Sequence, residues 1–458
     1  MREGRNPPAR RLILLGLNEI NFDVAARYLE NMHLPALSRL VAGHGIRTTA
    51  EQKYESLEPW IQWPSVHSGL SATEHGIYRL GDIVHNPVPQ FFEQLEKSGV
   101  KVGAVSPMNA SNELRDPAYF IPDPWTQTKS DGSYWSRVLG AAVSQAVNDN
   151  SRQALTPSSA IHLVLGLVRF AKPRHYAAYV RLAARSRAAP WRKALFLDLF
   201  LHDLHMSLYR ARNPGFSTLF LNAGAHIQHH YFFNARALQG DFELRNPSWY
   251  VDASVDPFAE MLEVYDLIIG DYLSEPGTDL IVATGLSQKP YDRLKFYYRL
   301  KKHAEFLKRI GIKFSAVVPR MTRDFLIEFA DSADALAAQR RLENVRVNDG
   351  IPLFEEIDNR GSSLFVTLTY PSEITGSSSI VSDGLTYPLA PDVTFVALKN
   401  GMHQSRGFAY FNSGTAPYAP QEGDHVKSLH RTVERYFDSA LRNTMSNAET
   451  VSSSSVRA

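Results

Sequence analysis

Histidine spacing gives the first sign of chemistry in this chain. His226 and His229 are three residues apart in the segment AHIQHH over 225–230. If this segment is helical, both imidazole rings lie on one face of the helix. Imidazole nitrogens are common ligands of zinc and other transition metals. The chain has no cysteine, so a metal site must use histidine, carboxylate, amide or water ligands.

Carboxylates occur where an α/β sheet would place its ligands. Glu19 follows a buried strand predicted over 11–17, and Ser56 and Glu58 lie just before a helix predicted over 59–69. In open α/β sheets, ligands bind at the carboxyl ends of the strands. We therefore take Glu19, Ser56 and Glu58 as candidate catalytic residues. A carboxylate before a helix is also an ordinary capping arrangement, so Glu58 has a structural alternative.

Strands and helices alternate along most of the chain. Apolar runs predict strands at 11–17, 46–50, 100–105, 217–222, 279–283 and 393–398. Helical periodicity and capping residues predict helices that include 22–30, 59–69, 89–97, 256–273 and 289–310. This alternation predicts an α/β fold with a doubly wound, mostly parallel central sheet, helices on both faces and a helical insertion.

Changes in composition divide the chain into four predicted parts. The N-terminal part of the α/β core covers 1–132, a basic helical insertion covers 133–213, and the remainder of the core with a small cap covers 214–443. The tail over 444–458 is rich in serine and is expected to be disordered.

The bulk composition is that of a globular protein. The 458 residues are 44% hydrophobic and 21% charged, and a net charge of +2 favours no particular partner. No stretch approaches the ~20 apolar residues of a membrane-spanning helix. The apolar run over 12–17 is too short for a secretory signal. We expect a cytoplasmic protein, with peripheral contact to a membrane left open.

The segment over 60–77 carries a family resemblance. It reads WIQWPSVHSGL over 60–70 and TEHGI over 73–77. It resembles the segment that carries the nucleophile helix in the type I phosphodiesterase and nucleotide pyrophosphatase branch of the alkaline phosphatase superfamily. The resemblance extends over roughly 11–110 and 215–405. It implies an alkaline-phosphatase-like fold and a hydrolase that uses two metal ions on a phosphoester.

Several site positions of that family hold other residues here. The resemblance places the first metal-binding aspartate on Asn18, an amide that is a weaker zinc ligand than a carboxylate. It places the nucleophile on Pro59, which has no hydroxyl. An aspartate of the next element falls on Ala225, and an Asp-His pair falls on Thr284 and Gly285. A complete two-metal site is therefore not expected.

Two metal-binding histidines of the family are retained. They fall on His229 and His403, which in the family serve the same metal. With His226 they would give three nitrogen donors for one divalent metal, Zn²⁺ or Mn²⁺, with Asn18 or Glu19 beside them and one position open. A hydrogen-bonded histidine cluster without a metal is the alternative.

Other residues would contact a substrate if the cleft is functional. Trp60 and Trp63 share a helix face and could stack on a sugar ring or a base, with core packing as the alternative. Asn109, Lys289 and Arg406 are candidate contacts to anionic or hydroxyl groups.

Basic side chains collect in the predicted insertion with no acidic residue among them. They are Lys172, Arg174, Arg181, Arg185, Arg187, Arg192 and Lys193. The ordinary interpretation is a solvated basic helix face. The functional interpretation is a surface for an anionic lipid or an acidic glycan. Nucleic acid is not expected, because the rest of the chain does not reinforce the charge.

Three functions remain open on the sequence alone. The first is hydrolysis or transfer of a phosphoester-containing sugar or nucleotide with a reduced metal site. The second is a catalytically degenerate binding protein, a pseudoenzyme, for such a small molecule or glycan. The third is a metal-free transferase in glycan or envelope polysaccharide biosynthesis. The sequence does not indicate an oligomeric state.

Overall fold

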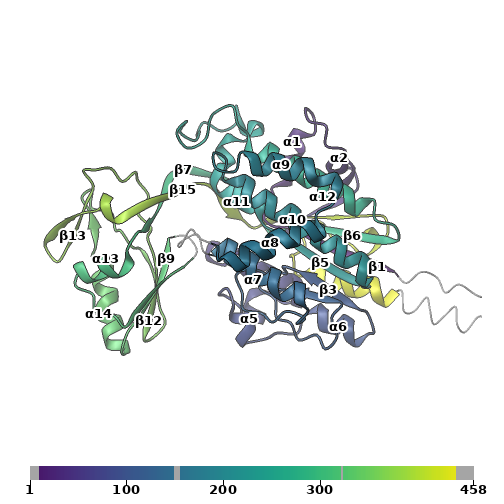
Figure 1. Ribbon diagram of the computed structural model, residues 1–458, viewed down its shortest axis with the longest axis horizontal. Helices are drawn as coiled ribbons and strands as arrows, with labels where there is room; N and C mark the ends of the chain where they lie inside the picture. Colours follow the sequence, from purple (N-terminus) through teal and green to yellow (C-terminus); the bar gives the residue numbers. More distant parts are fainter. Residues whose placement is uncertain (1–9, 149–154, 321–322, 440–458) are drawn as a thin grey trace, which may run out of the picture.

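The computed structural model describes residues 10–148, 155–320 and 323–439 and shows two lobes joined by a long two-stranded ribbon (Figure 1). The ribbon pairs β7 (Ser287–Leu300) with β15 (Val393–Gln404) in antiparallel fashion. The larger lobe holds an α/β core, and the smaller lobe is built from the chain between the two ribbon strands. The predicted disordered tail over 444–458 lies outside the described residues.

A seven-stranded sheet organises the larger lobe. Its order is β2 (His44–Thr49), β16 (Arg406–Phe411), β6 (Thr278–Ala283), β1 (Arg11–Leu17), β5 (Phe216–Leu221), β3 (Val102–Val105) and β4 (Tyr119–Ile121). β16 runs antiparallel to both of its neighbours, and the other pairs are parallel. The strands read as apolar runs because both sheet faces are covered. The predicted fold class is confirmed.

Helices cover both faces of this sheet. Ile13 and Leu15 of β1 face a layer made by α1 (Phe22–Tyr28), α2 (Pro35–Val41), α10 (Trp191–Arg212), α11 (Ala223–Tyr231) and α12 (Pro257–Leu273). Leu12 and Leu14 face a layer made by α3 (Pro59–Ser68), α6 (Phe91–Lys97) and a helix over 428–439. Successive β1 side chains thus enter opposite layers, as the pleat of a strand requires. Short helices α4 (Ala72–His75) and α5 (Asp82–His85) follow α3.

The segment predicted as a helical insertion forms four helices. They are α7 (Tyr134–Asn148), α8 (Pro157–Phe170), α9 (Tyr176–Ala184) and α10. α10 belongs to the main core, because Leu199, Leu204 and Tyr209 are fully buried in the layer that covers β5. α7 packs on β4, and α8 and α9 pack against α10.

The smaller lobe has its own hydrophobic core. A four-stranded sheet has the order β11 (Glu356–Asn359), β12 (Ser363–Thr367), β9 (Asp324–Glu328) and β8 (Ala316–Pro319). A three-stranded sheet holds β10 (Arg346–Val347), β13 (Ser379–Ser382) and β14 (Leu385–Pro388). Two helices, α13 (His303–Arg309) and α14 (Ser332–Glu343), complete the lobe.

The helix predicted over 289–310 is wrong. β7 covers most of this segment, and only α13 at its end is helical. Phe296, Tyr298 and Leu300 recur at every second position, and aromatic residues favour strands. The period of two therefore decides the structure, and the lysines and arginines between these residues do not make the segment helical. Within the described residues, no helix is long and apolar enough to cross a membrane.

Candidate metal and anion site

Glu19, His229 and His403 meet at the carboxyl edge of the central sheet. Glu19 follows β1, His229 lies on α11 directly after β5, and His403 lies near the end of β15. Glu19 Oε2 is 3.1 Å from His229 Nε2 and 3.0 Å from His403 Nε2. The two Nε2 atoms are 3.3 Å apart. The structure thus joins three of the predicted site residues.

These separations fit the ligands of a single metal ion. In a tetrahedral zinc site with bonds of about 2.0–2.1 Å, neighbouring ligand atoms are roughly 3.3 Å apart. Glu19 is almost fully buried, whereas the His229 side chain is 30% exposed, so the group opens to solvent on the His229 side. One carboxylate and two imidazoles could hold a divalent ion and leave a position free for a substrate.

The backbone at Glu19 explains why its side chain turns toward the histidines. Glu19 has a φ of 61°, in the left-handed region that residues other than glycine rarely adopt. Its amide donates to Thr284 O, and its carbonyl accepts from Gln228 Nε2. Neighbouring strand residues normally point to opposite faces, but this bend brings Asn18 and Glu19 into one network. Strain of this kind is often held at functional sites.

Amides on both sides fix the Glu19 carboxylate. Gln288 Nε2 donates to Glu19 Oε2 over 2.5 Å and to Ala225 O over 3.0 Å. Asn18 Nδ2 donates to Glu19 Oε1 over 3.0 Å. Gln288 was not predicted from the sequence. Its place appears only once β7 pairs with β15, which puts Gln288 directly opposite His403.

Asn18 was predicted to be a metal ligand, and in this structure its side chain orients the Glu19 carboxylate. Its Oδ1 accepts from Trp63 Nε1 over 3.0 Å, and its Nδ2 also donates to Asn222 Oδ1. The amide oxygen that would bind a metal is therefore engaged elsewhere. Glu19 supplies the carboxylate instead.

His226 lies outside the group, so the predicted set of three histidines is not formed. Its ring centroid is 5.0 Å from that of His230 and 6.0 Å from that of Tyr231. His226 therefore packs against His230, its i+4 neighbour on α11. Glu19, and not His226, supplies the third donor atom.

Glu58 points at the donor group and does not cap its helix. It occupies the N-cap position of α3, but its side chain makes no capping hydrogen bond. Its Oε2 lies 3.6 Å from His403 Nδ1. Within the described residues Ser56 makes no hydrogen bond or ion pair to Glu19, Glu58 or the two histidines, and its carbonyl accepts from Gln62. Glu58 is therefore the better candidate for moving a proton.

The ionisation of these groups is strongly coupled. Burial, together with the charge of Glu19 and against the opposing charge of His403, raises the pKa of Glu58 to about 7. Burial alone would raise the pKa of Glu19, but His403 and His229 hold it well below its usual range. Burial alone would lower the pKa of His403, but Glu19 raises it to about 8.

Cations on the ribbon border the group. Lys399 and Lys295 are directly opposite each other on β15 and β7. Burial, together with the positive charges of Lys295 and Arg323, lowers the pKa of Lys399 to about 8. The charge of Lys399 also acts on the pKa of Glu58 and of His403. Positive charges of the ribbon therefore adjoin the donors, with Glu58 and Glu356 as nearby opposite charges.

The two predicted tryptophan contacts have structural roles. Trp63 is 1% exposed, and its ring packs edge-to-face on Phe220 and against Gly16, where a Cβ would lie 2.7 Å from Cη2. Trp60 is half-buried and donates from Nε1 to Tyr78 O. Trp63 is therefore core, and stacking of a ligand on it is wrong.

The other predicted substrate contacts divide into one core residue and two surface residues. Asn109 is fully buried, accepts from Gly81 N and donates to Trp60 O, so it holds two loops together. Arg406 is exposed and pairs with Asp23 over 2.9 Å. Lys289 is exposed on β7 next to Gln288. Lys295 and Lys399, rather than these three, supply the charge at the donor group.

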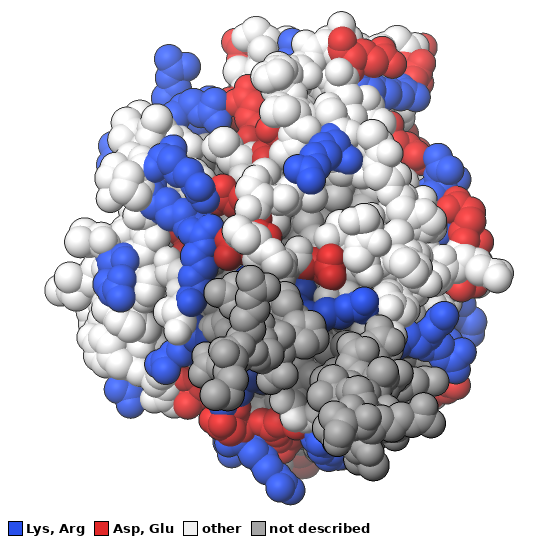
Figure 2. All heavy atoms as spheres, turned by 90° about the vertical axis from the view of Figure 1, so that its right-hand side faces the viewer, with Lys and Arg blue, Asp and Glu red and all other residues white. Residues whose placement is uncertain are grey.

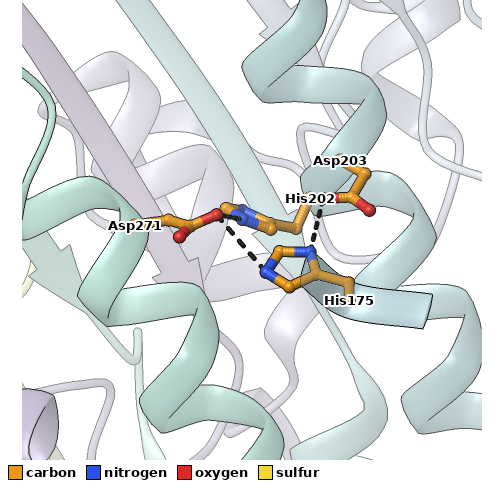
Figure 3. Close-up of side chains that lie close together, drawn as sticks. All are labelled: His175, His202, Asp203 and Asp271. Carbon is orange, nitrogen blue, oxygen red and sulfur yellow. Dashed lines mark hydrogen bonds and ion pairs between the residues drawn. The ribbon is translucent and has the colours of Figure 1, made fainter. Parts of the chain in front are cut away.

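A second group of histidines and carboxylates lies elsewhere in the core. Figure 3 shows His175, His202, Asp203 and Asp271, whose donor atoms lie within 4.8 Å of one another. This buried His/Asp group could also hold a metal ion by geometry. His175 Nδ1 is 2.8 Å from Asp203 Oδ1, and His202 Nε2 is 2.8 Å from Asp271 Oδ2.

Cations of the chain already balance this second group. Lys172 Nζ lies 3.7 Å from Asp203 Oδ1 and 3.3 Å from Asp271 Oδ2, and Arg174 also pairs with Asp271. The group lies near the amino ends of the strands, since His205, three residues after His202, hydrogen-bonds Ser217 at the start of β5. It therefore fits a buried ion-pair network better than a reaction centre.

Comparison with known proteins gives structural but not sequence relatives. No family model matches the chain, and no curated protein matches its sequence. Similar solved structures include phosphonoacetate hydrolase from Sinorhizobium meliloti 1021 in complex with phosphonoformate, at 13% identity and a TM-score of 0.39, covering 95% of this chain and 98% of that chain. Murine ectonucleotide pyrophosphatase/phosphodiesterase 5 has 10% identity and a TM-score of 0.37, covering 93% and 94%.

A variant of TAB5 alkaline phosphatase with Mg bound in its M3 site is similar at 10% identity and a TM-score of 0.40, covering 93% of this chain and 96% of that chain. All three matches have TM-scores of 0.40 or below. At this similarity they carry no activity, metal or substrate over to this chain.

Proposed function

We propose that this chain hydrolyses or transfers a phosphoester with the help of one divalent metal ion. The observation that carries the proposal is the convergence of Glu19, His229 and His403, whose three donor atoms lie 3.0–3.3 Å apart at the carboxyl edge of the sheet. A divalent ion bound there would act as a Lewis acid toward a phosphoryl oxygen and lower the pKa of a bound water.

Hydrogen bonds from neighbouring side chains orient the Glu19 carboxylate. Gln288 and Asn18 each donate a hydrogen bond to one oxygen of Glu19. Orientation of a ligating carboxylate by such partners typically changes metal affinity or activity by about 10–100-fold. His229, the most exposed of the three donors, borders the open side where a substrate would enter.

The ribbon lysines support an anionic substrate. Like charges directly opposite on an antiparallel pair destabilise the sheet, and Lys399 and Lys295 form such a pair. Arg323, which lies over the Tyr297 ring at 4.1 Å, adds a third positive charge that acts on both lysines. A phosphoester would offset this repulsion when bound, which supports a phosphorylated small molecule, such as a sugar or a nucleotide, as the substrate class.

Glu58 supplies the proton acceptor. Its Oε2 lies 3.6 Å from His403 Nδ1 at the edge of the donor group, where the carboxylate can accept a proton as a general base. In hydrolysis a water oxygen forms a bond to phosphorus while the ester P–O bond breaks. Glu58 takes the proton of that water, and the leaving oxygen takes a proton from solvent.

A second candidate is a binding protein for the same ligands. It is favoured by Pro59 at the first turn of α3, where the sequence resemblance places a nucleophile. Such a protein would bind the metal and the phosphorylated ligand without turnover. A metal-free transferase, the third function open on the sequence, would need none of the three donors for metal binding.

The test is turnover of p-nitrophenyl phosphate and bis(p-nitrophenyl) phosphate with added Zn²⁺ or Mn²⁺. We compare the wild type with Glu19→Gln and with His226→Gln, a matched control on α11 outside the donor group. The proposal expects metal-dependent turnover that Glu19→Gln abolishes and His226→Gln keeps. Turnover that survives Glu19→Gln would overturn the metal mechanism, and metal-dependent phosphate binding without turnover would favour the binding protein.

A further inference from the structure

The outward face of α8 is apolar over two turns. Ile161, Val164, Leu165 and Val168 are exposed, with Val164 at 62% and Val168 at 78%. They recur at the i, i+3, i+4 and i+7 spacing of one helix face. Four neighbouring exposed aliphatic side chains are unusual on a solvent-facing helix.

The inward face of α8 is apolar as well. Gly166 and Phe170 are buried, and Leu163 and Leu167 pack against the main core. The helix therefore already satisfies its core contacts with one face. A helix that is apolar on all faces is normally buried on all sides. The exposed outward face of α8 is therefore a candidate binding surface.

α9 also has exposed apolar side chains. Tyr176 and Val180 are one helical turn apart and both exposed, with Val180 at 67%. α8 and α9 both pack against α10, and Figure 1 shows the three helices on the same side of the core lobe. We call the exposed residues of α8 and α9 the α8–α9 face.

Unpaired cations border the α8–α9 face. Between residues 155 and 197 the sequence has no aspartate or glutamate. Within the described residues, four exposed cations of this segment make no ion pair: Arg169, Arg185, Arg187 and Lys193. Figure 2 shows Lys and Arg side chains along the left edge of the face that it draws.

The remaining cations of the segment are already partnered. Arg181 pairs with Glu263 and Arg192 with Glu260, while Lys172 and Arg174 pair with Asp271. The free charge thus lies at the end of α8 and in the turn between α9 and α10. It adjoins the apolar residues instead of being spread over the whole lobe.

We propose that the α8–α9 face binds the surface of an anionic lipid membrane. Aliphatic and aromatic side chains enter the boundary between headgroups and acyl chains, and adjacent Arg and Lys side chains contact anionic headgroups. An apolar stripe with a basic border is complementary to both layers of such a surface. A second copy of this chain would bring the same unpaired cations together at its interface, which disfavours self-association.

Vesicle sedimentation of the full chain tests this inference. We compare phosphatidylcholine vesicles with vesicles that also contain phosphatidylglycerol, at low and high salt. Val164→Ser/Val168→Ser removes apolar contacts, and Arg185→Glu/Arg187→Glu reverses charge. The matched control is Leu336→Ser/Leu385→Ser, two exposed leucines of the smaller lobe. Thermal unfolding verifies that each variant folds.

The inference expects binding only to the anionic vesicles, weaker at high salt because the charges are screened. Each variant of the α8–α9 face should weaken binding by roughly tenfold or more, while the control binds as the wild type does. It is overturned if the wild type does not bind at low salt or if the valine variant binds unchanged. It is also overturned if size-exclusion chromatography shows a dimer that the valine variant dissociates.

Discussion

Glu19 Oε2 lies 3.0 Å from His403 Nε2, although the two residues are 384 positions apart in the chain. Glu19 follows β1, and His403 lies near the end of β15. Their contact therefore depends on the ribbon, which also connects the smaller lobe. The ribbon places Gln288, Lys295 and Lys399 around the same point. The site therefore combines residues of the larger lobe with residues of the ribbon.

Replacing Glu58 by glutamine should slow turnover without removing the metal. The amide keeps the shape of the side chain but accepts no proton, and loss of a general base typically costs about 10²–10⁴-fold in rate. The measurement is kcat on bis(p-nitrophenyl) phosphate, with metal content measured on the same sample. An unchanged kcat would show that Glu58 does not move the proton.

Anion binding should weaken as the pH rises past 8. Burial and neighbouring cations lower the pKa of Lys399 to about 8, so the side chain loses its charge above that pH. Titration with inorganic phosphate between pH 7 and pH 9.5 should show this loss in the wild type. Lys399→Arg stays charged over the whole range and should bind equally well at both ends. The account fails here if both proteins show the same pH dependence.

Asp198 should make the protein less stable as the pH rises from 4 to 7. Burial raises its pKa to about 7, despite hydrogen bonds from Ala223 N and Tyr265 Oη. The folded protein therefore binds this proton more tightly than the unfolded chain, where the pKa is about 3.9. Its contribution falls by at most about 1.4 kcal/mol per pH unit between the two values.

Asp198→Asn cannot titrate and isolates this effect. Urea unfolding at several pH values gives the difference in unfolding free energy between the wild type and the variant. That difference should shift in favour of the variant from pH 4 to pH 7 and level off above. A difference that stays constant over this range would show that Asp198 is ionised in the folded protein throughout.

Trp63→Phe should destabilise the fold. The change leaves Asn18 Oδ1 without its buried donor and removes ring atoms that pack on Gly16. An orphaned buried acceptor costs roughly 1–3 kcal/mol, and the cavity adds to this. Denaturant unfolding measures the loss. A variant as stable as the wild type would contradict the core role assigned to Trp63.

Most of the central sheet could be predicted because its strands are apolar runs of limited length. β1 covers 11–17 as predicted, and β6 and β5 begin within a residue of their predicted starts. The starts of two helices could be predicted from residues typical of helix N-termini. Asn21 caps α1, and Pro59 is the first residue of α3. Strand β7 of the ribbon was predicted as a helix because lysines and arginines lie between the apolar residues that recur at every second position.

The site could be predicted only in part. His229 and His403 follow from the resemblance, and Glu19 from its place after a strand. Glu19 takes the place predicted for His226 because its backbone has a positive φ. A single sequence does not reveal a positive φ at a glutamate. Lys295 and Lys399 become neighbours only through the register of two strands about a hundred residues apart.

Metal content tests the central claim most directly. The protein is purified without chelator or affinity metal, equilibrated with Zn²⁺ or Mn²⁺, desalted and measured by elemental analysis beside Glu19→Gln, His403→Gln and His226→Gln. The account predicts about one metal ion per chain in the wild type and in His226→Gln, and loss of that ion in the other two. An ion that persists in Glu19→Gln and His403→Gln, or a wild type that binds none, would contradict it.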